Sequence, residues 1–236
     1  MFTKSAAFYD AIYGWKDYAG EAQKLDALIR QHKRSTGVTL LDVACGTGAH
    51  APFLRTTYEY KGLDLDDEML AVAREQYPDL SFHHGDMANF DLGRQFDVVT
   101  CLFSSIGYAR TATKLRQTLA NLARHTQPGG VVIVEPWFTP EQWHSGRIHA
   151  FLVDEPELKI CRMARSEIEG TMSILYFDYL VGTPTSADHF SERHEMGLFT
   201  HDAYLEAFRT AGLDASFDEE GLMGRGLYIG TKTNAH

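Results

Sequence analysis

The sequence predicts an α/β fold, with a doubly wound, mostly parallel sheet of seven strands and a small antiparallel β subdomain inserted late in the chain. In residues 38–137, short and almost wholly apolar segments alternate with helix-compatible segments, and such apolar runs are typical of strands buried on both faces. Residues 137–200 change to alternating polar and apolar side chains, the pattern of antiparallel strands with one solvent-exposed face.

The first predicted strand runs from Val38 to Val43 and ends in Ala-Cys-Gly-Thr-Gly, before a helix-compatible segment that begins near His50. Small residues let the backbone approach a ligand closely and permit positive φ. A strand, a glycine turn and a helix N-terminus together predict a site for the polar end of a nucleoside-containing cofactor. Because Gly46 to Ala51 also fits G-x-G-x-x-A, a nicotinamide oxidoreductase remains an alternative on this motif.

Two carboxylates are expected beside this turn. Asp42 lies inside the strand, and a buried acid is costly unless it is paired, so we expect it to accept hydrogen bonds from the glycine turn or to meet a cationic ligand. Asp64 ends the second predicted strand, in EYKGLDL, where a carboxylate accepts from the ribose hydroxyls of an adenosine. Asp66 or Asp67 is expected to cap the following helix.

The third and fourth strands also end in polar residues. Residues 80–84 lead into Gly-Asp-Met, and residues 96–101 lead into a Ser-Ser-Ile-Gly loop. Because ligands bind at the carboxyl ends of the strands in an open α/β sheet, Leu102 is expected to line the adenosine pocket, with Ser105 and Tyr108 facing the reaction site. His83 and His84 point to opposite faces of a strand, so no metal site is predicted.

The rest of the chain completes the core around the insertion. Residues 130–137 predict the fifth strand, residues 137–200 a short helix plus a small antiparallel sheet over the cleft, and the C-terminal residues a helix and a hairpin. The core therefore comprises residues 1–136 and 201–236. Arg225 lies in a glycine-rich turn, and a fixed cation there suits phosphate recognition, although a solvated turn arginine is the alternative.

Residues 1–35 form an aromatic segment followed by an amphipathic helix. Tyrosine combines an apolar body with a polar tip, so this segment is either a hydrophobic flap on the core or a lid whose phenols meet cofactor or substrate. The aromatic residues are Phe2, Phe8, Tyr9, Tyr13, Trp15 and Tyr18.

Composition narrows the function. The 236 residues carry a formal net charge of −10, which disfavours a nucleic-acid partner. The sequence has no membrane-length apolar run, and no signal peptide is expected. The three cysteines lack metal-ligand spacing and are expected as reduced thiols in a cytoplasmic protein.

Several motifs together resemble a known family. The spacing D-x-A-C-G-x-G resembles the first motif of class I S-adenosylmethionine-dependent methyltransferases, which have a Rossmann-like fold. The narrower motifs VACGTGAH, LFSSIGY, EPWFTPE, MGRGLY and KDY resemble the sugar N,N-dimethyltransferases that act on thymidine-diphosphate amino sugars in macrolide antibiotic biosynthesis, of the desosamine and mycaminose type. The resemblance implies S-adenosylmethionine as cofactor, a nucleotide-linked amino sugar as substrate, and a possible homodimer built through the inserted sheet.

The resemblance and the strand-end argument together give the candidate site. The expected cofactor contacts are Tyr9, Tyr18, Asp42, Ala44, Gly46, Gly48, Asp64, Leu65, Asp86, Met87 and Leu102. The expected substrate contacts are Phe2, Ser105, Tyr108, Trp137 and Arg225, and the expected catalytic residues are Tyr18 and Tyr108. Tyr18 is expected near the methionine carboxylate, Asp86 and Met87 near the adenine, and Arg225 near the diphosphate.

Two positions depart from the family pattern. The family's loop histidine, which lies close to the substrate amine, is replaced by Tyr108, and its tyrosine near the N-terminus is replaced by Phe2. A methyl group on a sulfonium is already activated, so transfer depends mainly on placement. The departures therefore bear on orientation and sugar choice more than on chemistry. The alternatives are an O- or N-methyltransferase for another small metabolite and a non-catalytic cofactor-binding protein.

Overall fold

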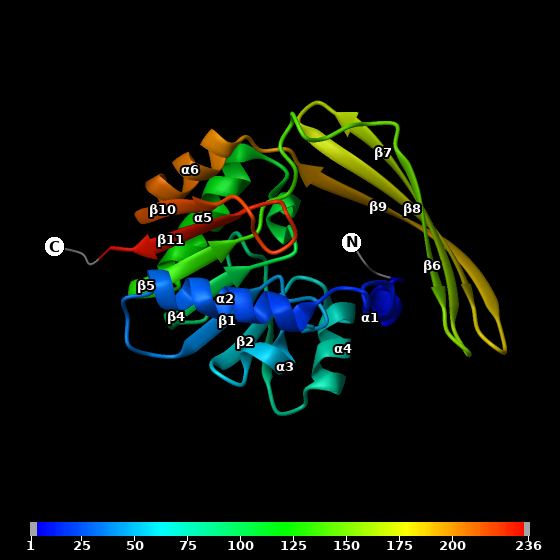
Figure 1. Cartoon of the computed structure of the whole chain (residues 1–236), viewed down its shortest axis with the longest axis horizontal. Helices are drawn as coiled ribbons and strands as arrows, with labels where there is room; N and C mark the ends of the chain where they lie inside the picture. The colour runs from blue at the N-terminus through cyan, green and yellow to red at the C-terminus, as the bar shows by residue number, and fades with distance from the viewer. Residues whose placement is uncertain (1–3, 234–236) are drawn as a thin grey trace.

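The computed structural model describes residues 4–233, which form a large sheet with helices on both faces and a second sheet that extends from it (Figure 1). The large sheet has seven strands in the order β10-β11-β5-β4-β1-β2-β3. The strands β1 to β5 pair in parallel, and β11 runs antiparallel to both of its neighbours, β10 and β5. The predicted doubly wound, mostly parallel sheet and its closing hairpin are confirmed. Phe2, a predicted substrate contact, lies outside the described residues.

The elements of the core follow the predicted order. Its strands are β1 (Thr39–Val43), β2 (Glu59–Asp64), β3 (Ser81–His84), β4 (Phe96–Cys101), β5 (Thr126–Val134), β10 (Leu213–Asp218) and β11 (Leu227–Lys232). Its helices are η1 (Ala6–Phe8), α1 (Tyr9–Ile12), α2 (Tyr18–His32), α3 (Ala51–Leu54), α4 (Asp67–Gln76), η2 (Ser105–Ala109), α5 (Ala112–Arg124) and α6 (His201–Thr210). Val38 precedes the first strand instead of belonging to it.

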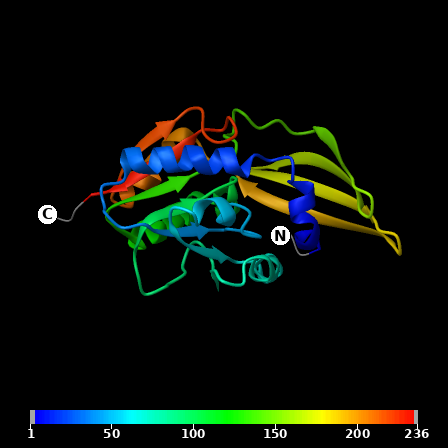
Figure 2. The same ribbon diagram turned by 60° about the horizontal axis from the view of Figure 1, so that its bottom comes forward.

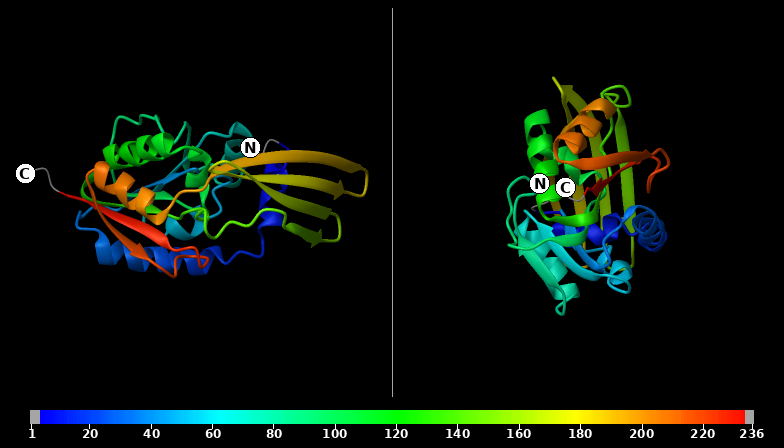
Figure 3. Two further views of the ribbon diagram at one scale, coloured as in Figure 1. Left: turned by 90° about the horizontal axis from the view of Figure 1, so that it is seen from above. Right: turned by 90° about the vertical axis from the view of Figure 1, so that its left-hand side faces the viewer.

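The strands are buried on both faces because each contributes alternate side chains to two apolar layers. In β1, Leu40 packs with α2 and α3, whereas Leu41 packs with α5 and α6. Figure 3 shows α2 on one side of the sheet, with α5 and α6 on the other. These two layers hold the carboxyl ends of β1, β2 and β4 at one edge, which is where the site is built. None of the helices within residues 4–233 is both long and apolar enough to cross a bilayer.

The inserted residues form a four-stranded antiparallel sheet in the order β6-β7-β8-β9, made of Ile148–Asp154, Lys159–Glu169, Met172–Gly182 and Ala187–Gly197. The predicted antiparallel pattern is confirmed, but the predicted short helix is wrong. Residues 137–147 form only turns, at 140–142 and at 145–146, and the positive φ of Gly146 prevents a helix from continuing through it.

The N-terminal segment lies between the two sheets (Figure 2). Ile12 of α1 is buried among apolar residues of β6 to β9. On the other side, the carboxylate of Asp10 accepts hydrogen bonds from Thr47 Oγ1 at 2.6 Å and from Gln76 Nε2 at 2.6 Å. This segment therefore contacts both the inserted sheet and the glycine turn that follows β1.

Candidate active site

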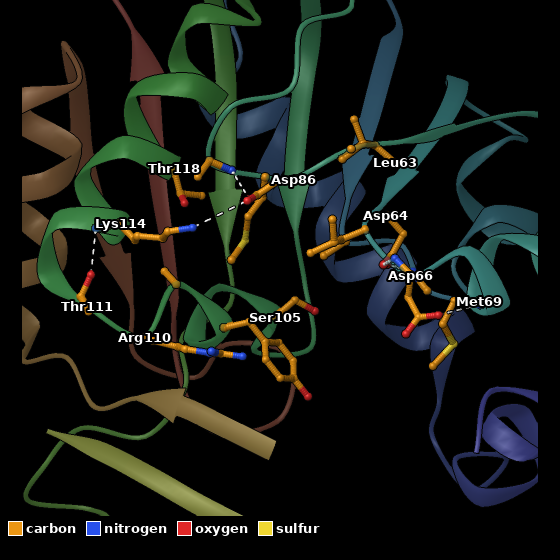
Figure 4. Close-up of a pocket in the computed structure, with 18 of the residues that line it drawn as sticks. Leu63, Asp64, Asp66, Met69, Asp86, Ser105, Arg110, Thr111, Lys114 and Thr118 are labelled. Carbon is orange, nitrogen blue, oxygen red and sulfur yellow. Dashed lines mark hydrogen bonds and ion pairs between the residues drawn. The ribbon is translucent and has the colours of Figure 1, made fainter. Parts of the chain in front are cut away.

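A cavity of about 400 Å³ opens at the carboxyl ends of β1, β2 and β3 (Figure 4). Ligand pockets of proteins are of this size, roughly 300–1,000 Å³. The predicted site residues that line it are Tyr9, Ala44, Gly46, Asp64, Leu65, Asp86, Met87, Ser105 and Tyr108. Residues from five separate stretches of sequence are therefore brought together as the strand-end argument predicts.

The glycine turn and Asp64 form one hydrogen-bonded unit. Ala44 and Gly46 have φ of 59° and 57°, and the turn aims the amide of Gly46 at Asp64 Oδ2, 2.7 Å away. Asp64 Oδ1 accepts from the amide of Asp66 at 2.9 Å. Burial raises the pKa of Asp64, and these amides oppose the rise. Each carboxylate oxygen has two acceptor positions, so the group can still accept from a ligand hydroxyl in the cavity.

Asp42 does not make the predicted hydrogen bonds to the glycine turn. Its carboxylate also does not line the cavity: Oδ1 accepts from Thr100 Oγ1 at 2.8 Å and Oδ2 from Tyr60 Oη at 2.9 Å. Only 2% of Asp42 is exposed, and burial raises its pKa. The partners come from β4 and β2, on either side of β1, so Asp42 ties three strands together beneath the turn.

Three further predicted cofactor contacts lie away from the cavity wall. Leu102 is buried with Leu40 and the other residues on the α2 face of the sheet, because neighbouring residues of an extended chain point to opposite faces. Gly48 has φ of 77°, and a Cβ there would lie 3.3 Å from the Phe82 ring, so its role is to fit the turn to the core. Tyr18 packs edge-on against His50, with ring centroids 4.9 Å apart.

Tyr18 belongs to a buried polar cluster beside the glycine turn. The ammonium of Lys16 lies over the Tyr18 ring, 4.6 Å from its centroid, and is paired with the carboxylate of Glu21. The same carboxylate contacts His50 Nε2 at 2.8 Å. Burial works to raise the pKa of Glu21, but its bonds to His50 and Lys16 lower it overall. The cluster places a fixed cation and a phenol next to the turn.

Asp86 and Met87 follow β3 and face the cavity as predicted. Asp86 Oδ1 accepts from the amide of Ala88 at 2.9 Å, and Asp86 Oδ2 lies 3.7 Å from Lys114 Nζ. Asn121 Nδ2 donates to the carbonyl of Met87 at 3.2 Å, which restrains the backbone at this position. Lys114 and Arg110 also line the cavity. The sequence did not indicate them, because they resemble ordinary solvent-facing residues of a helix and its approach.

The loop after β4 carries Ser105 and Tyr108 in a constrained conformation. Phe103 and Ser104 have φ of 50° and 62°, which costs energy for residues with a side chain. Glu135 Oε2 accepts from the amide of Phe103 at 2.7 Å, and Ser104 Oγ donates to the carbonyl of Pro136 at 2.6 Å. These bonds hold the loop so that Ser105 and Tyr108 reach the cavity.

Arg225 is a half-buried residue, not a solvated turn arginine. Its Nη2 lies 3.3 Å from Glu135 Oε1, and its guanidinium is 5.9 Å from the Trp137 ring and 5.7 Å from the Phe138 ring. Burial raises the pKa of Glu135, and Arg225 opposes the rise. Within residues 4–233, Arg225 Nε has no hydrogen-bond acceptor. Neither Arg225 nor Trp137 lines the cavity, so both lie at a separate part of the predicted substrate site.

The residues present suit the predicted cofactor. A carboxylate at the end of β2, a second one after β3, a thioether and a positive-φ turn surround a cavity large enough for a nucleoside. No group of three or more histidine, cysteine, aspartate or glutamate side chains within residues 4–233 is arranged to hold a metal ion.

Comparisons with known proteins agree with this geometry. Residues 40–130 match the family model described as "Methyltransferase domain". The dTDP-3-amino-3,6-dideoxy-alpha-D-glucopyranose N,N-dimethyltransferase of Streptomyces fradiae is 42% identical over 95% of this chain and 89% of its own length. The crystal structure of DesVI from Streptomyces venezuelae has a TM-score of 0.91 at 39% identity, over 97% of this chain and 98% of that one.

A second solved structure extends the comparison to a ligand complex. It is an S-adenosylmethionine-bound amino pentose methyltransferase of calicheamicin biosynthesis, from Micromonospora echinaspora. Its TM-score is 0.85 at 37% identity, over 96% of this chain and 95% of that one.

Proposed function

The chain belongs to the dTDP-amino-sugar N,N-dimethyltransferases, and from that membership we propose that it methylates the amine of a dTDP-linked deoxy amino sugar, twice, with S-adenosylmethionine as cofactor. It is thus an S-adenosylmethionine-dependent N-methyltransferase of antibiotic biosynthesis. The observation that carries the proposal is the unit formed by the Gly46 amide and the Asp64 carboxylate, both of which line the cavity. High identity over nearly the whole length of the relatives supports the substrate class.

Residues of the cavity hold the cofactor. Asp64 accepts from the ribose hydroxyls, Asp86 accepts from the adenine amine, and Met87 covers the ring. The positive-φ turn at Ala44 and Gly46 lets the backbone come close to the ligand. Tyr18 and Lys16, beside this turn, are proposed to meet the methionine carboxylate, since both offer donors. When bound, the cofactor supplies a methyl group on a positively charged sulfur, which needs no further activation.

Residues around the loop after β4 hold the substrate. The Arg225 guanidinium, with an unpartnered Nε within the described residues, is proposed to bind the diphosphate, since arginine forms strong charge-assisted bonds with phosphate oxygens. Trp137 provides an apolar wall beside it. Ser105 and Tyr108 line the cavity and are proposed to orient the sugar, and Phe2 remains a proposed contact outside the described residues. The chain's task is mainly placement of amine and methyl carbon.

The assembly and location of the protein are also proposed. A homodimer through the inserted sheet is supported by exposed apolar side chains on one face of it, Ile148, Leu152, Met163 and Leu180, because such patches mark interaction sites. Residues 137–200 would then serve as an assembly and substrate unit on the methyltransferase core. Free Cys45, Cys101 and Cys161 support a cytoplasmic location, and the net charge of −10 supports a small-molecule partner over nucleic acid.

Turnover of the unchanged chain on a panel of dTDP-amino sugars, with isotopically labelled S-adenosylmethionine, tests the proposal. We expect label on the sugar amine and a product heavier by two methyl groups. Methyl transfer only to hydroxyl or carboxyl groups of other metabolites would overturn the substrate assignment. Tight cofactor binding with no transfer to any amine would overturn the activity.

A further inference from the structure

Behind Tyr108, two buried ionisable side chains continue in a line away from the cavity. Tyr108 Oη is 2.7 Å from His194 Nδ1, and His194 Nε2 is 3.4 Å from Glu192 Oε2. His194 is 1% exposed and Glu192 is 7% exposed. Only Tyr108 of the three lines the cavity. Both inner residues lie on β9, on the face of the inserted sheet that is turned toward the core.

The carboxylate at the inner end is held as an anion. Glu192 Oε1 accepts from the amides of Lys4 and Ser5, both at 3.1 Å, and Oε2 accepts from Ser5 Oγ at 2.8 Å. Burial works to raise the pKa of Glu192, but the bonds from His194 and Ser5 lower it overall. An ionised carboxylate next to an imidazole fixes the tautomer, because its oxygens accept only. This assigns the proton to His194 Nε2, so that Nδ1 accepts from the Tyr108 hydroxyl.

The surroundings of the imidazole favour its neutral form. Burial lowers the pKa of His194, the bond to Glu192 opposes the fall, and the guanidinium of Arg162 on β7 adds to it. The uncharged ring of Phe177 on β8 covers it, with centroids 5.1 Å apart. Burial likewise raises the pKa of the Tyr108 phenol, with Tyr13 and Glu192 adding to the rise. A neutral phenol therefore faces the cavity, backed by a neutral base and a fixed anion.

We propose that Tyr108, His194 and Glu192 form a proton relay that deprotonates the substrate amine. The proposal rests on the proposed function, because it assigns the relay to the nitrogen that is methylated. The N–H bond of the ammonium breaks with its electrons left on nitrogen, and the proton joins Tyr108 Oη. The hydroxyl proton of Tyr108 passes to His194 Nδ1, and Glu192 stabilises the resulting imidazolium. After the product leaves, the proton returns through Tyr108 to water in the cavity.

The relay explains how Tyr108 can stand where the resembled family has a loop histidine. Where relatives of the resembled family place a histidine near the amine, this chain has a tyrosine that reaches a histidine on another sheet. The base is thereby moved one residue away from the nitrogen. Each methyl transfer leaves a positive charge on nitrogen, so a second transfer requires the loss of a further proton from the sugar amine. Tyr108 contacts the substrate in this arrangement, and His194 and Glu192 are positioning residues that act through it.

The variant His194→Asn distinguishes a proton relay from a purely structural hydrogen bond to Tyr108. The asparagine Oδ1 can accept from Tyr108 near the place of Nδ1 but cannot take up a proton. His189→Asn is the matched control, because His189 lies on the same strand with its side chain 64% exposed. Tyr108→Phe is the second variant, which keeps the ring and removes only the hydroxyl. Each variant is first checked for an unchanged circular dichroism spectrum.

Two measurements test the relay. The first is kcat/KM against pH with the dTDP-amino sugar. For His194→Asn and Tyr108→Phe we expect a loss of about tenfold or more at pH 6.5, in the low range for general acid–base catalysis, that shrinks as pH rises toward 9.5 and the amine loses its proton in solution. The second is ¹⁵N NMR of the unchanged chain without ligands, in which we expect a neutral His194 with its proton on Nε2.

The outcomes distinguish the relay from the proposed function. A loss of equal size at every pH, or a protonated or Nδ1–H imidazole at pH 7.5, would overturn the relay while leaving the methyltransferase assignment in place. Should the unchanged chain turn over no dTDP-amino sugar, the proposed function fails, and the relay fails with it. His189→Asn is expected to match the unchanged chain throughout.

Discussion

The unit formed by Asp64 and the glycine turn makes a quantitative prediction about cofactor binding. In Asp64→Asn one oxygen becomes an NH₂ group, which then faces the amide of Gly46 or of Asp66, so two donors oppose each other. A bond to a charged group contributes about 1.5–3 kcal/mol and a neutral one about 0.5–1.5 kcal/mol. Weakening the two ribose bonds by about 1 kcal/mol each gives about 2 kcal/mol, or a Kd for S-adenosylmethionine roughly 30-fold higher.

The stability of the variant is expected to change less than its affinity. Burial raises the pKa of Asp64, so its charge is disfavoured in the folded protein, and removing that charge offsets part of the lost hydrogen bonding. Isothermal titration calorimetry gives the Kd, and thermal unfolding gives the stability. Asp67→Asn is the control, since Asp67 is exposed, lies in the first turn of α4 and does not line the cavity. An unchanged Kd in Asp64→Asn would refute the ribose assignment.

Three further predictions concern other parts of the molecule. Arg225→Gln should raise the KM for the nucleotide sugar about 10- to 100-fold, as loss of a charge-assisted bond implies, with the cofactor Kd unchanged by calorimetry; an unchanged KM contradicts the diphosphate assignment. Burial lowers the pKa of His194, so near the ordinary histidine pKa of about 6.5 the unfolded chain binds more protons than the folded chain, and the folded protein loses stability as pH falls below 6.5. In urea unfolding, the free energy of unfolding of His194→Asn should therefore fall less steeply between pH 6.5 and 5 than that of the unchanged chain. An equally steep fall in both would contradict the neutral imidazole. Leu152→Glu, at a side chain 69% exposed, should convert a dimer to monomer in sedimentation velocity, whereas Ile168→Glu on the opposite face should not; a dimer that survives Leu152→Glu contradicts the proposed interface.

The fold was predictable because its signals are local. Apolar runs of strand length, helices between them and the Asp66 cap, which accepts from the amides of Glu68 and Met69, can all be inferred from neighbouring residues. The short helix predicted after residue 137 failed because Gly146 adopts a left-handed conformation soon after the turn at residues 140–142, and this conformation does not follow from the neighbouring residues.

The site was predictable where a residue lies at a strand end, as at Asp64 and Asp86, or on the loop that follows a strand, as at Tyr108. Asp42 was misassigned because its partners, Tyr60 and Thr100, come from neighbouring strands, and pairing register cannot be deduced from one strand alone. Leu102 failed because the face to which it points depends on where β4 ends. His194 and Glu192 were missed because they sit in an alternating strand, 86 and 84 positions after the loop tyrosine, and only the folding of the inserted sheet toward the core brings them near it.

Glu135 has a consequence for how substitutions around it are interpreted. One of its oxygens restrains the left-handed Phe103 at the start of the tyrosine-bearing loop, and the other meets the guanidinium of Arg225. A ligand that draws the arginine away leaves that anion with a single partner, in a place where its charge is already disfavoured. If Arg225 binds the diphosphate as proposed, Glu135 links the nucleotide end of the site to the loop that carries Tyr108. A substitution at Glu135 therefore perturbs both Arg225 and the Tyr108 loop, and its kinetic effect does not measure the contribution of either one alone.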